Sequence, residues 1–288
     1  MASISIFANY FINDEERLQR LKDSFNSFKD ICATKWIINI RGMFKHEVSE
    51  FLRAHLGERV SIHNLESRRG WFNDTRKLLG EIDSDFVLFW IEDHINLAPT
   101  SKYVDIIADM QRHNVDVVSY SWFDSLSKHR FRSIPKQSAG TIDFFRWDHE
   151  ANEIIQRDGG SYIIGACSIF RAAFFRKIVQ SNQPYLRRHN PLTPFDFEKR
   201  PHDTMWLPFV KGVPCFELFA VIDDDVSGPS LQSRGLYPIR AERAKMIELS
   251  HGKTSAWKHI LPSPLFLTLR PIAIFFRRIR YSLIYFLS

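Results

Sequence analysis

The chain has 288 residues, of which 44% are hydrophobic and 25% are charged. This length allows one large or two small domains with a substantial core, and the composition excludes an intrinsically disordered chain. The formal net charge of +6 favours an anionic partner, such as a nucleic acid, an anionic membrane or a phosphate-bearing substrate. The three cysteines form no Cys-x-x-Cys pair, so neither a structural zinc site nor a redox motif is predicted.

Strands and helices are expected to alternate over the first 120 residues. Apolar runs predict strands at residues 4–10, 35–40, 59–64, 86–91 and 116–120. Apolar residues spaced by three or four predict helices at residues 14–28, 47–56, 71–82 and 103–112. This alternation predicts an α/β protein whose mainly parallel sheet is covered by helices on both faces.

The pattern changes after residue 122. Residues 124–160 are mixed, polar and basic, and the prolines in residues 182–201 indicate a long loop. A strand is expected at residues 162–170 and a helix at 171–179. A short helix at residues 202–210, ended by Lys211-Gly212, and a late strand at residues 215–222 follow.

Residues 262–288 are expected to form a separate unit after a main domain of residues 1–261. On a helix, one face would carry the apolar residues Ile272, Phe275, Phe276, Ile279, Leu283, Phe286 and Leu287. The other face would carry Arg270, Arg277, Arg278 and Arg280. This pattern predicts an amphipathic helix in a membrane interface, and the alternative is a helix docked on the protein body or on a partner.

The localisation follows from the same segment and from two features that the sequence lacks. No secretory signal is found at the N-terminus. No stretch approaches the roughly 18–20 apolar residues of a spanning helix. We therefore expect a cytoplasmic protein that is peripheral on the inner face of the membrane.

The apolar run at residues 86–91 ends abruptly in Glu92-Asp93-His94. Ligands of open α/β sheets bind beyond the carboxyl ends of such strands. Because alternate side chains of a strand share a side, Glu92 and His94 are expected to point together and Asp93 the other way, unless the strand has already turned. Two carboxylates and an imidazole are suited to a divalent cation, and the cation to a diphosphate. The alternative is a strand end that only caps the next segment.

This context resembles that of GT-A glycosyltransferases of the large inverting family 2 type, over residues 1–120 and more loosely over 160–220. In that family a buried strand ends in an acidic Asp-x-Asp motif that binds the metal and the sugar nucleotide. Here Glu92 stands in the first acidic position and His94 in the last. The resemblance implies a Rossmann-like GT-A fold in which Glu92 and His94 hold a cation and Asp93 contacts the donor. Imidazole suits Mn²⁺ better than Mg²⁺.

Five further positions match residues that bind the sugar nucleotide in the family. Gly70 and Arg76 match a glycine and a helix-borne arginine that precede the acidic motif. Asn9 and Tyr10, at the end of the first predicted strand, and Arg41, at the end of the second, match nucleotide contacts. The resemblance therefore implies a donor-diphosphate site. The alternative for Arg76 is a solvated helix face.

A second match begins at His202-Asp203. In the family an acidic pair opens a helix, and its second acid is the catalytic base. The resemblance therefore implies that Asp203 takes the proton from the acceptor hydroxyl as that hydroxyl attacks the anomeric carbon. An N-cap of the following helix is the alternative role for Asp203. Asp196 and Glu198 are competing carboxylates in the same loop.

A third acidic cluster, Asp223-Asp224-Asp225, follows the late strand. Three consecutive side chains point in different directions, so a solvated turn is predicted there in preference to a metal site. Asp223, Asp224 and Asp225 are therefore not expected to take part in the donor site.

The resemblance implies an inverting glycosyltransferase that moves a sugar from a nucleoside diphosphate sugar to a hydroxyl of a lipid-linked or growing glycan acceptor. It implies no nucleic-acid partner. One alternative is a nucleotidyltransferase of similar α/β fold, but its glycine-rich phosphate loop is missing from residues 8–14. The other alternative is a non-catalytic membrane-associated binding protein.

Overall fold

The structure is a computed structural model that describes residues 2–67, 70–119, 134–157, 164–165, 167–180, 197, 206–223 and 230–238. His202-Asp203 and residues 262–288 lie outside the described residues. The catalytic base, the amphipathic helix and the division at residue 261 therefore stay predictions.

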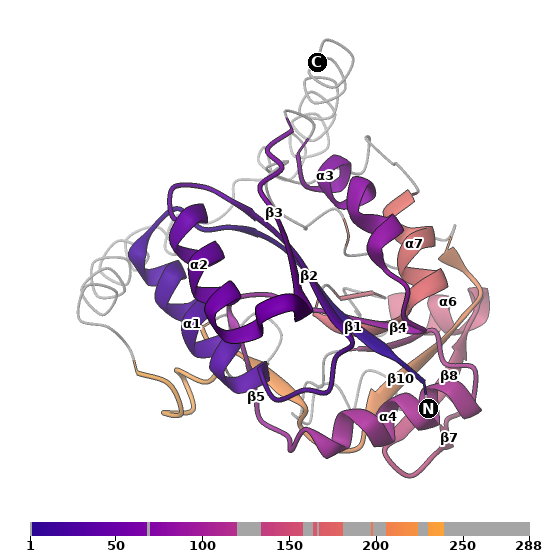
Figure 1. Ribbon diagram of the computed structural model, residues 1–288. Helices are drawn as coiled ribbons and strands as arrows, with labels where there is room; N and C mark the ends of the chain where they lie inside the picture. The colour runs from indigo at the N-terminus through magenta and orange to yellow at the C-terminus, as the bar shows by residue number, and fades with distance from the viewer. Residues whose placement is uncertain are drawn as a thin grey trace, which may run out of the picture.

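A mixed sheet of nine strands crosses the described part of the molecule (Figure 1). Its strands, in spatial order, are β3 (Val60–His63), β2 (Lys35–Arg41), β1 (Ile4–Phe11), β4 (Phe86–Phe89), β9 (Ser168–Arg171), β6 (Val117–Ser119), β10 (Phe209–Pro214), β8 (Ile142–Trp147) and β7 (Gln137–Ser138). Within this sheet only β8 and β9 run against the other strands. The predicted α/β class with a mainly parallel sheet is confirmed.

A second sheet, of two strands, lies beyond the end of β4. It pairs β5 (His94–Asn96) with β11 (Phe219–Val221) in antiparallel fashion. The strand predicted at residues 86–91 is therefore too long, because β4 ends at Phe89 and the chain turns before β5 begins. The strand predicted at residues 215–222 is likewise reduced to β11.

Helices cover both faces of the large sheet (Figure 1). The helices are α1 (Glu15–Phe28), α2 (Lys45–Leu56), α3 (Trp71–Leu78), α4 (Ser101–Arg112), α6 (His149–Arg157) and α7 (Ala172–Gln180). Apolar residues of α1, α2 and α4 pack into one core layer, and those of α3, α6 and α7 pack into the other. The β1 strand supplies both layers because its side chains alternate, with Ile6 on one face and Phe7 on the other.

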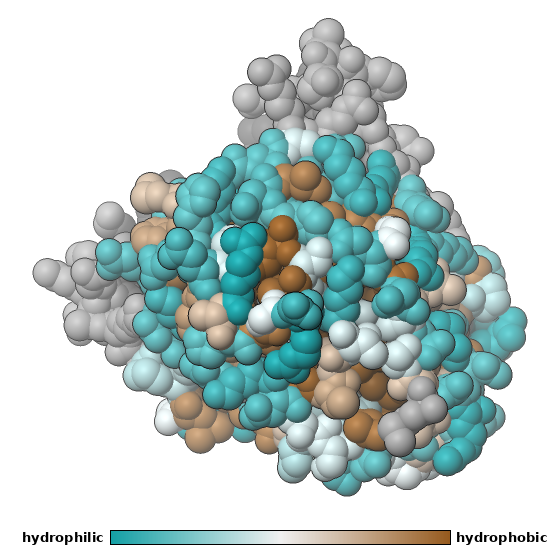
Figure 2. Space-filling model, viewed as in Figure 1, coloured by the Kyte–Doolittle hydropathy of each residue, from teal (hydrophilic) through white to brown (hydrophobic). Residues whose placement is uncertain are grey.

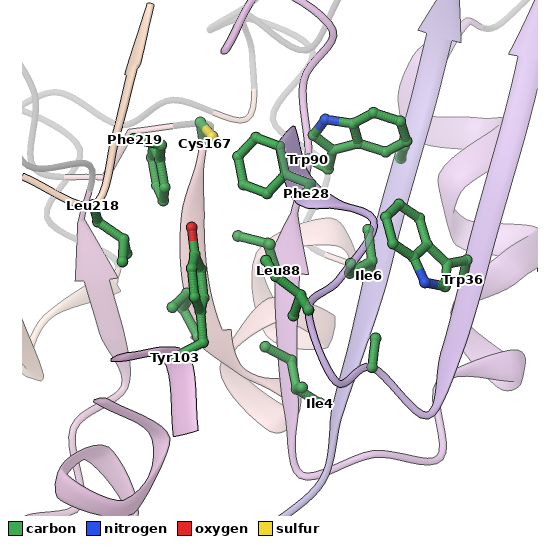
Figure 3. Packing of buried hydrophobic residues seen from close by; sticks show 14 of the residues in the cluster. Ile4, Ile6, Phe28, Trp36, Leu88, Trp90, Tyr103, Cys167, Leu218 and Phe219 are labelled. Atoms are coloured by element: carbon green, nitrogen blue, oxygen red, sulfur yellow. The ribbon is translucent and has the colours of Figure 1, made fainter. Parts of the chain in front are cut away.

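Large aromatic side chains fill the layer under α1, α2 and α4 (Figure 3). The rings of Trp36 and Trp90 meet edge to face, with their centroids 5.3 Å apart. Both side chains are fully buried, and removing one such side chain from water is worth on the order of 2–3 kcal/mol. The face in Figure 2 is largely hydrophilic, with hydrophobic residues in small areas between the polar ones.

The helix predicted at residues 202–210 and ended by Lys211-Gly212 is wrong from Leu207 onwards, because residues 207–208 are not helical and β10 begins at Phe209. Lys211 and Gly212 lie inside β10, which pairs with β6 on one edge and β8 on the other. Gly212 does not end a helix here. A Cβ atom at this position would lie 2.9 Å from Val118 Cγ2, so close packing against β6 requires a glycine.

Three elements were missed in the region expected to be mixed and polar, namely β7, β8 and α6. The β8 strand buries Ile142 and Trp147 while Arg146 is exposed, as is typical of a strand near a sheet edge. Lys211 of β10 is buried, with its ammonium group 4.9 Å from the centroid of the Trp147 ring. Burial lowers the pKa of Lys211 to about 7. Of the helices described, none has the length and hydropathy needed to span a bilayer.

Candidate functional site

The polar triplet Glu92-Asp93-His94 emerges where β4 leaves the large sheet. The backbone turns at Glu92 and Asp93, and His94 begins β5. The Ile222 amide donates to the Asp93 carbonyl at 2.8 Å, which ties the turn to the end of β11. The expectation that Glu92 and His94 point to the same side assumed a continuous strand. Because the chain turns between them, strand alternation no longer predicts where these two side chains point.

The three side chains of the triplet have different surroundings. The Glu92 carboxylate is buried, with 9% of its side chain exposed, and lies 3.2 Å from an Arg17 nitrogen. Asp93 is the more open carboxylate, with 36% of its side chain exposed, and its Oδ1 lies 2.5 Å from His94 Nδ1. Of the three side chains, the structure therefore leaves Asp93 the most accessible to a ligand.

Burial and charge act on the two carboxylates in opposite directions. Burial, followed by the charge of Asp93, raises the pKa of Glu92. Burial also acts to raise the pKa of Asp93. The charge and hydrogen bond of His94, together with the charges of Arg20 and Arg17, outweigh burial, so this pKa is lowered. The more exposed carboxylate of the pair is therefore also the one whose ionised form is favoured.

Two arginines of α1, which sequence reasoning missed, reach this cluster. Asp14 caps α1 by accepting a hydrogen bond from the Arg17 amide at 2.8 Å. Arg17 and Arg20 are three positions apart and therefore lie on neighbouring turns of one face. The available signal was this pair of arginines in the helix that directly follows the first strand.

Arg20 joins a third acidic residue to the triplet. Its guanidinium lies 2.7 Å from Asp223 Oδ2 and also binds Glu16. Only 9% of the Asp223 side chain is exposed, so the prediction of a solvated turn is wrong at this residue. The pairing of β11 with β5 brings Asp223 beside Asp93, because Ile222 is bonded to the Asp93 carbonyl.

Tyr10 adds a buried hydroxyl to the same cluster. Its ring packs edge to face on Trp90, with the ring centroids 5.1 Å apart. The phenol oxygen is buried and has no hydrogen-bond partner among the described residues. Burial raises the pKa of Tyr10 well above its ordinary value, and the charges of Glu92, Cys167 and Asp93 raise it further. The hydroxyl thus lies within electrostatic reach of the turn.

Arg41 lies at the end of β2 and is also within electrostatic reach of the triplet. Its side chain is buried, and its guanidinium carbon lies 5.9 Å from the centroid of the Phe11 ring. Burial lowers the pKa of Arg41, and the charges of Asp74, Glu66 and Glu92 oppose that shift. Among the predicted site residues, the structure therefore groups Arg41 and Tyr10 with the triplet.

Asn9 faces the other side of the sheet from Tyr10, because neighbouring strand residues alternate. Its amide nitrogen donates to the Trp71 carbonyl at 3.1 Å and to Thr75 Oγ1 at 2.9 Å. Its amide oxygen accepts a bond of 2.9 Å from Asn39. These bonds join β1, β2 and α3 in a buried network, and they engage both ends of the Asn9 side chain.

Gly70 and Arg76 belong to α3 and its start. Gly70 precedes the helix with φ of +76°, a conformation that glycine adopts without strain. Arg76 Nε donates to the Val179 carbonyl of α7 at 3.0 Å. Arg76 is therefore not on a solvated helix face, and its bond to Val179 leads to α7 and not to the triplet. Asp203 lies outside the described residues.

Among the residues described, no group of three or more His, Cys, Asp and Glu side chains is placed to hold a metal ion. A divalent ion bound to a diphosphate needs only one or two carboxylates, since phosphate oxygens and water complete its shell. Glu92 and Asp93 are adjacent carboxylates at the turn, and together they meet this requirement for one or two carboxylate ligands.

No protein-family model matches the sequence, and no curated protein matches it. Among solved structures, TarS 1–349 of S. aureus matches with a TM-score of 0.47 and 14% identity, over 75% of this chain and 59% of that chain. Glucosyl-3-phosphoglycerate synthase of Mycobacterium tuberculosis, in complex with Mn²⁺, UDP and phosphoglyceric acid, matches with a TM-score of 0.36 and 13% identity, over 60% of this chain and 57% of that chain. The mannosyltransferase PcManGT of Pyrobaculum calidifontis, in complex with GDP-Man and Mn²⁺, matches with a TM-score of 0.39 and 8% identity, over 62% of this chain and 46% of that chain. The chain thus spans less than two thirds of each.

The Asn9 network generates a stability prediction. We expect Asn9→Ala to lower the free energy of unfolding by about 3 kcal/mol, because it leaves buried partners on β2 and α3 unsatisfied. Urea unfolding measures this loss. Asn64→Ala is the control, since Asn64 donates one bond, to the Ile40 carbonyl at 3.1 Å, and should cost about 1 kcal/mol. Equal losses for the two variants would contradict the assigned role of Asn9.

Proposed function

We propose that this chain is an inverting GT-A glycosyltransferase that moves a sugar from a nucleoside diphosphate sugar to a hydroxyl of a lipid-linked or growing glycan acceptor. One observation carries the proposal. The charged turn after β4, with the buried hydroxyl of Tyr10 within its electrostatic reach, lies beyond the carboxyl ends of the parallel strands. Open α/β sheets bind nucleotides at this edge.

The residues at this turn support binding of the donor through a divalent cation, Mn²⁺ or Mg²⁺. Asp93 offers the most accessible carboxylate, and Glu92 lies beside it. His94, predicted as a metal ligand, has its Nδ1 on Asp93 and so also orients that carboxylate. When bound, the cation would neutralise the negative charge that develops on the leaving diphosphate. Arg41, within electrostatic reach of Glu92, adds positive potential to the donor site.

The acceptor side of the reaction is assigned to the predicted base Asp203. Displacement with inversion needs a carboxylate on the face of the sugar opposite the leaving diphosphate. This carboxylate removes the proton from the acceptor hydroxyl as the glycosidic bond forms. Asp203 is the residue that the family resemblance assigns to this role.

A nucleotide screen tests the proposed function. We expect at least one of UDP, GDP, ADP, CDP and dTDP to raise the melting temperature in the presence of Mn²⁺. Ligand at 100 times its Kd stabilises a protein by about 2.7 kcal/mol, which corresponds to roughly 5–10 °C for a chain of this size. Asp93→Asn should lose most of this shift.

Asp105→Asn is the matched control for the screen. It removes a carboxylate from the exposed face of α4, where Asp105 has a side-chain exposure of 53%, and it should keep the shift. The absence of any shift in the unmodified chain, with every nucleotide and with either cation, would reject the proposed function.

Asp203→Asn tests the assignment of the base. We expect this variant to lose about 10²–10⁴-fold in the rate of sugar transfer, which is the usual contribution of general base catalysis. Its nucleotide-dependent thermal shift should stay unchanged, because the base acts on the acceptor. Asp196→Asn and Glu198→Gln are controls from the same loop. If either control loses the rate while Asp203→Asn keeps it, the base has been assigned to the wrong carboxylate.

We further propose that residues 262–288 bind the protein to an anionic membrane surface, where a lipid-linked acceptor would lie. The full chain should sediment with vesicles that contain phosphatidylglycerol and remain in solution with vesicles of phosphatidylcholine alone, because the arginine-rich face needs anionic lipid. A chain that ends at residue 261 should remain in solution with both. Sedimentation of the shortened chain with the anionic vesicles would place the membrane contact elsewhere.

A further inference from the structure

Arg17 bridges the end of the first strand and the charged turn. Its Nη1 donates to the Phe11 carbonyl at 2.8 Å, and its Nη2 lies 3.2 Å from Glu92 Oε1. The Glu92 side chain is buried, whereas 41% of the Arg17 side chain is exposed. In this ion pair the carboxylate of Glu92 is held in the interior, whereas the guanidinium of Arg17 can move out into water.

Arg20 provides the contrast on the same face of α1. It is bound by two carboxylates, Glu16 and Asp223, and only 12% of its side chain is exposed. Opposite charges and hydrogen bonds from these partners outweigh the effect of burial, so the pKa of Arg20 is raised. Among the described residues, Arg17 is bound by one carboxylate. Arg20 is thus held in place, and Arg17 is the arginine that can leave the cluster.

Release of Arg17 would remove the ion pair of the buried Glu92 carboxylate. A buried ionised carboxylate without a partner is costly, so Glu92 must then take up either a proton or another cation. The cluster already carries an excess of carboxylates over guanidinium groups. The buried hydroxyl of Tyr10, without a partner among the described residues, is an unsatisfied polar group within electrostatic reach of Glu92. A divalent cation satisfies these requirements better than a second monovalent one.

We propose that Arg17 is a displaceable counter-ion of Glu92. A divalent cation takes its place on Glu92, and the released guanidinium turns outward and binds the diphosphate of the donor. The second half rests on the proposed function, whereas the first half does not. Arginine suits this exchange because its planar fork binds a carboxylate and a phosphate oxygen pair equally well.

Binding of Mn²⁺ alone tests the exchange. Electron paramagnetic resonance of free Mn²⁺ gives the affinity of the nucleotide-free protein for the ion. We expect Arg17→Gln to bind Mn²⁺ about five- to tenfold more tightly than the unmodified chain, because the ion no longer competes with an ion pair. Arg17→Lys keeps the charge and should bind Mn²⁺ like the unmodified chain.

Lys22→Gln is the matched control. It removes one positive charge from the same helix, but Lys22 pairs with Glu47 of α2 at 2.7 Å and is not part of the cluster. If Lys22→Gln tightens Mn²⁺ binding as much as Arg17→Gln does, the gain is a general charge effect and the proposal fails. Unchanged or weaker Mn²⁺ binding by Arg17→Gln also overturns it.

Nucleotide affinity at saturating Mn²⁺ tests the second half. Arg17→Gln should bind the nucleoside diphosphate found in the thermal screen about tenfold more weakly, through the loss of a charge-assisted contact. Equal nucleotide affinity would overturn the role of Arg17 at the diphosphate. If no nucleotide binds the unmodified chain but Arg17→Gln still gains affinity for Mn²⁺, the counter-ion exchange is supported and the proposed function fails.

Discussion

The pairing of β4 on both of its edges determines where the charged turn can form. Phe89 lies opposite Phe7 of β1 on one side and Ser168 of β9 on the other. A strand enclosed in this way has its backbone groups satisfied only while both neighbours continue. The ladder with β9 ends at Phe89 and the chain turns soon afterwards, so polar residues can reach the edge of the sheet. Glu92 and Asp93 lie at this turn.

The charge at this turn depends on α1 as much as on β4. The apolar face of α1 packs Leu21 and Phe25 into the core, and this packing sets the direction in which its arginines point. Arg17 and Arg20 then compensate part of the negative charge that burial would otherwise make costly. Asp223 reaches the same cluster only through the pairing of β11 with β5. The cluster is therefore assembled from segments that are about 200 residues apart.

The two faces of the sheet separate roles that look alike in the sequence. Asn9 and Tyr10 are neighbours in β1, yet Asn9 is bonded to α3 and Asn39, whereas Tyr10 packs on Trp90 beneath the charged turn. Adjacent residues of a strand cannot both approach one ligand from the same face. The amide of Asn9 stabilises the sheet and α3, and the hydroxyl of Tyr10 is the one within electrostatic reach of the charged turn.

The sequence by itself determined the alternating elements of the first 120 residues, because helical spacing and buried apolar runs are local signals. It also determined that a polar triplet follows a buried strand. Only the tertiary structure decided that β10 is a strand. The local sequence at Lys211 and Gly212 is typical of a helix end, and it is the pairing with β6 and β8 that makes this segment a strand. It likewise decided that Arg17, Arg20 and Asp223 join Glu92 and Asp93. Charge compensation depends on distances between segments that no local pattern encodes.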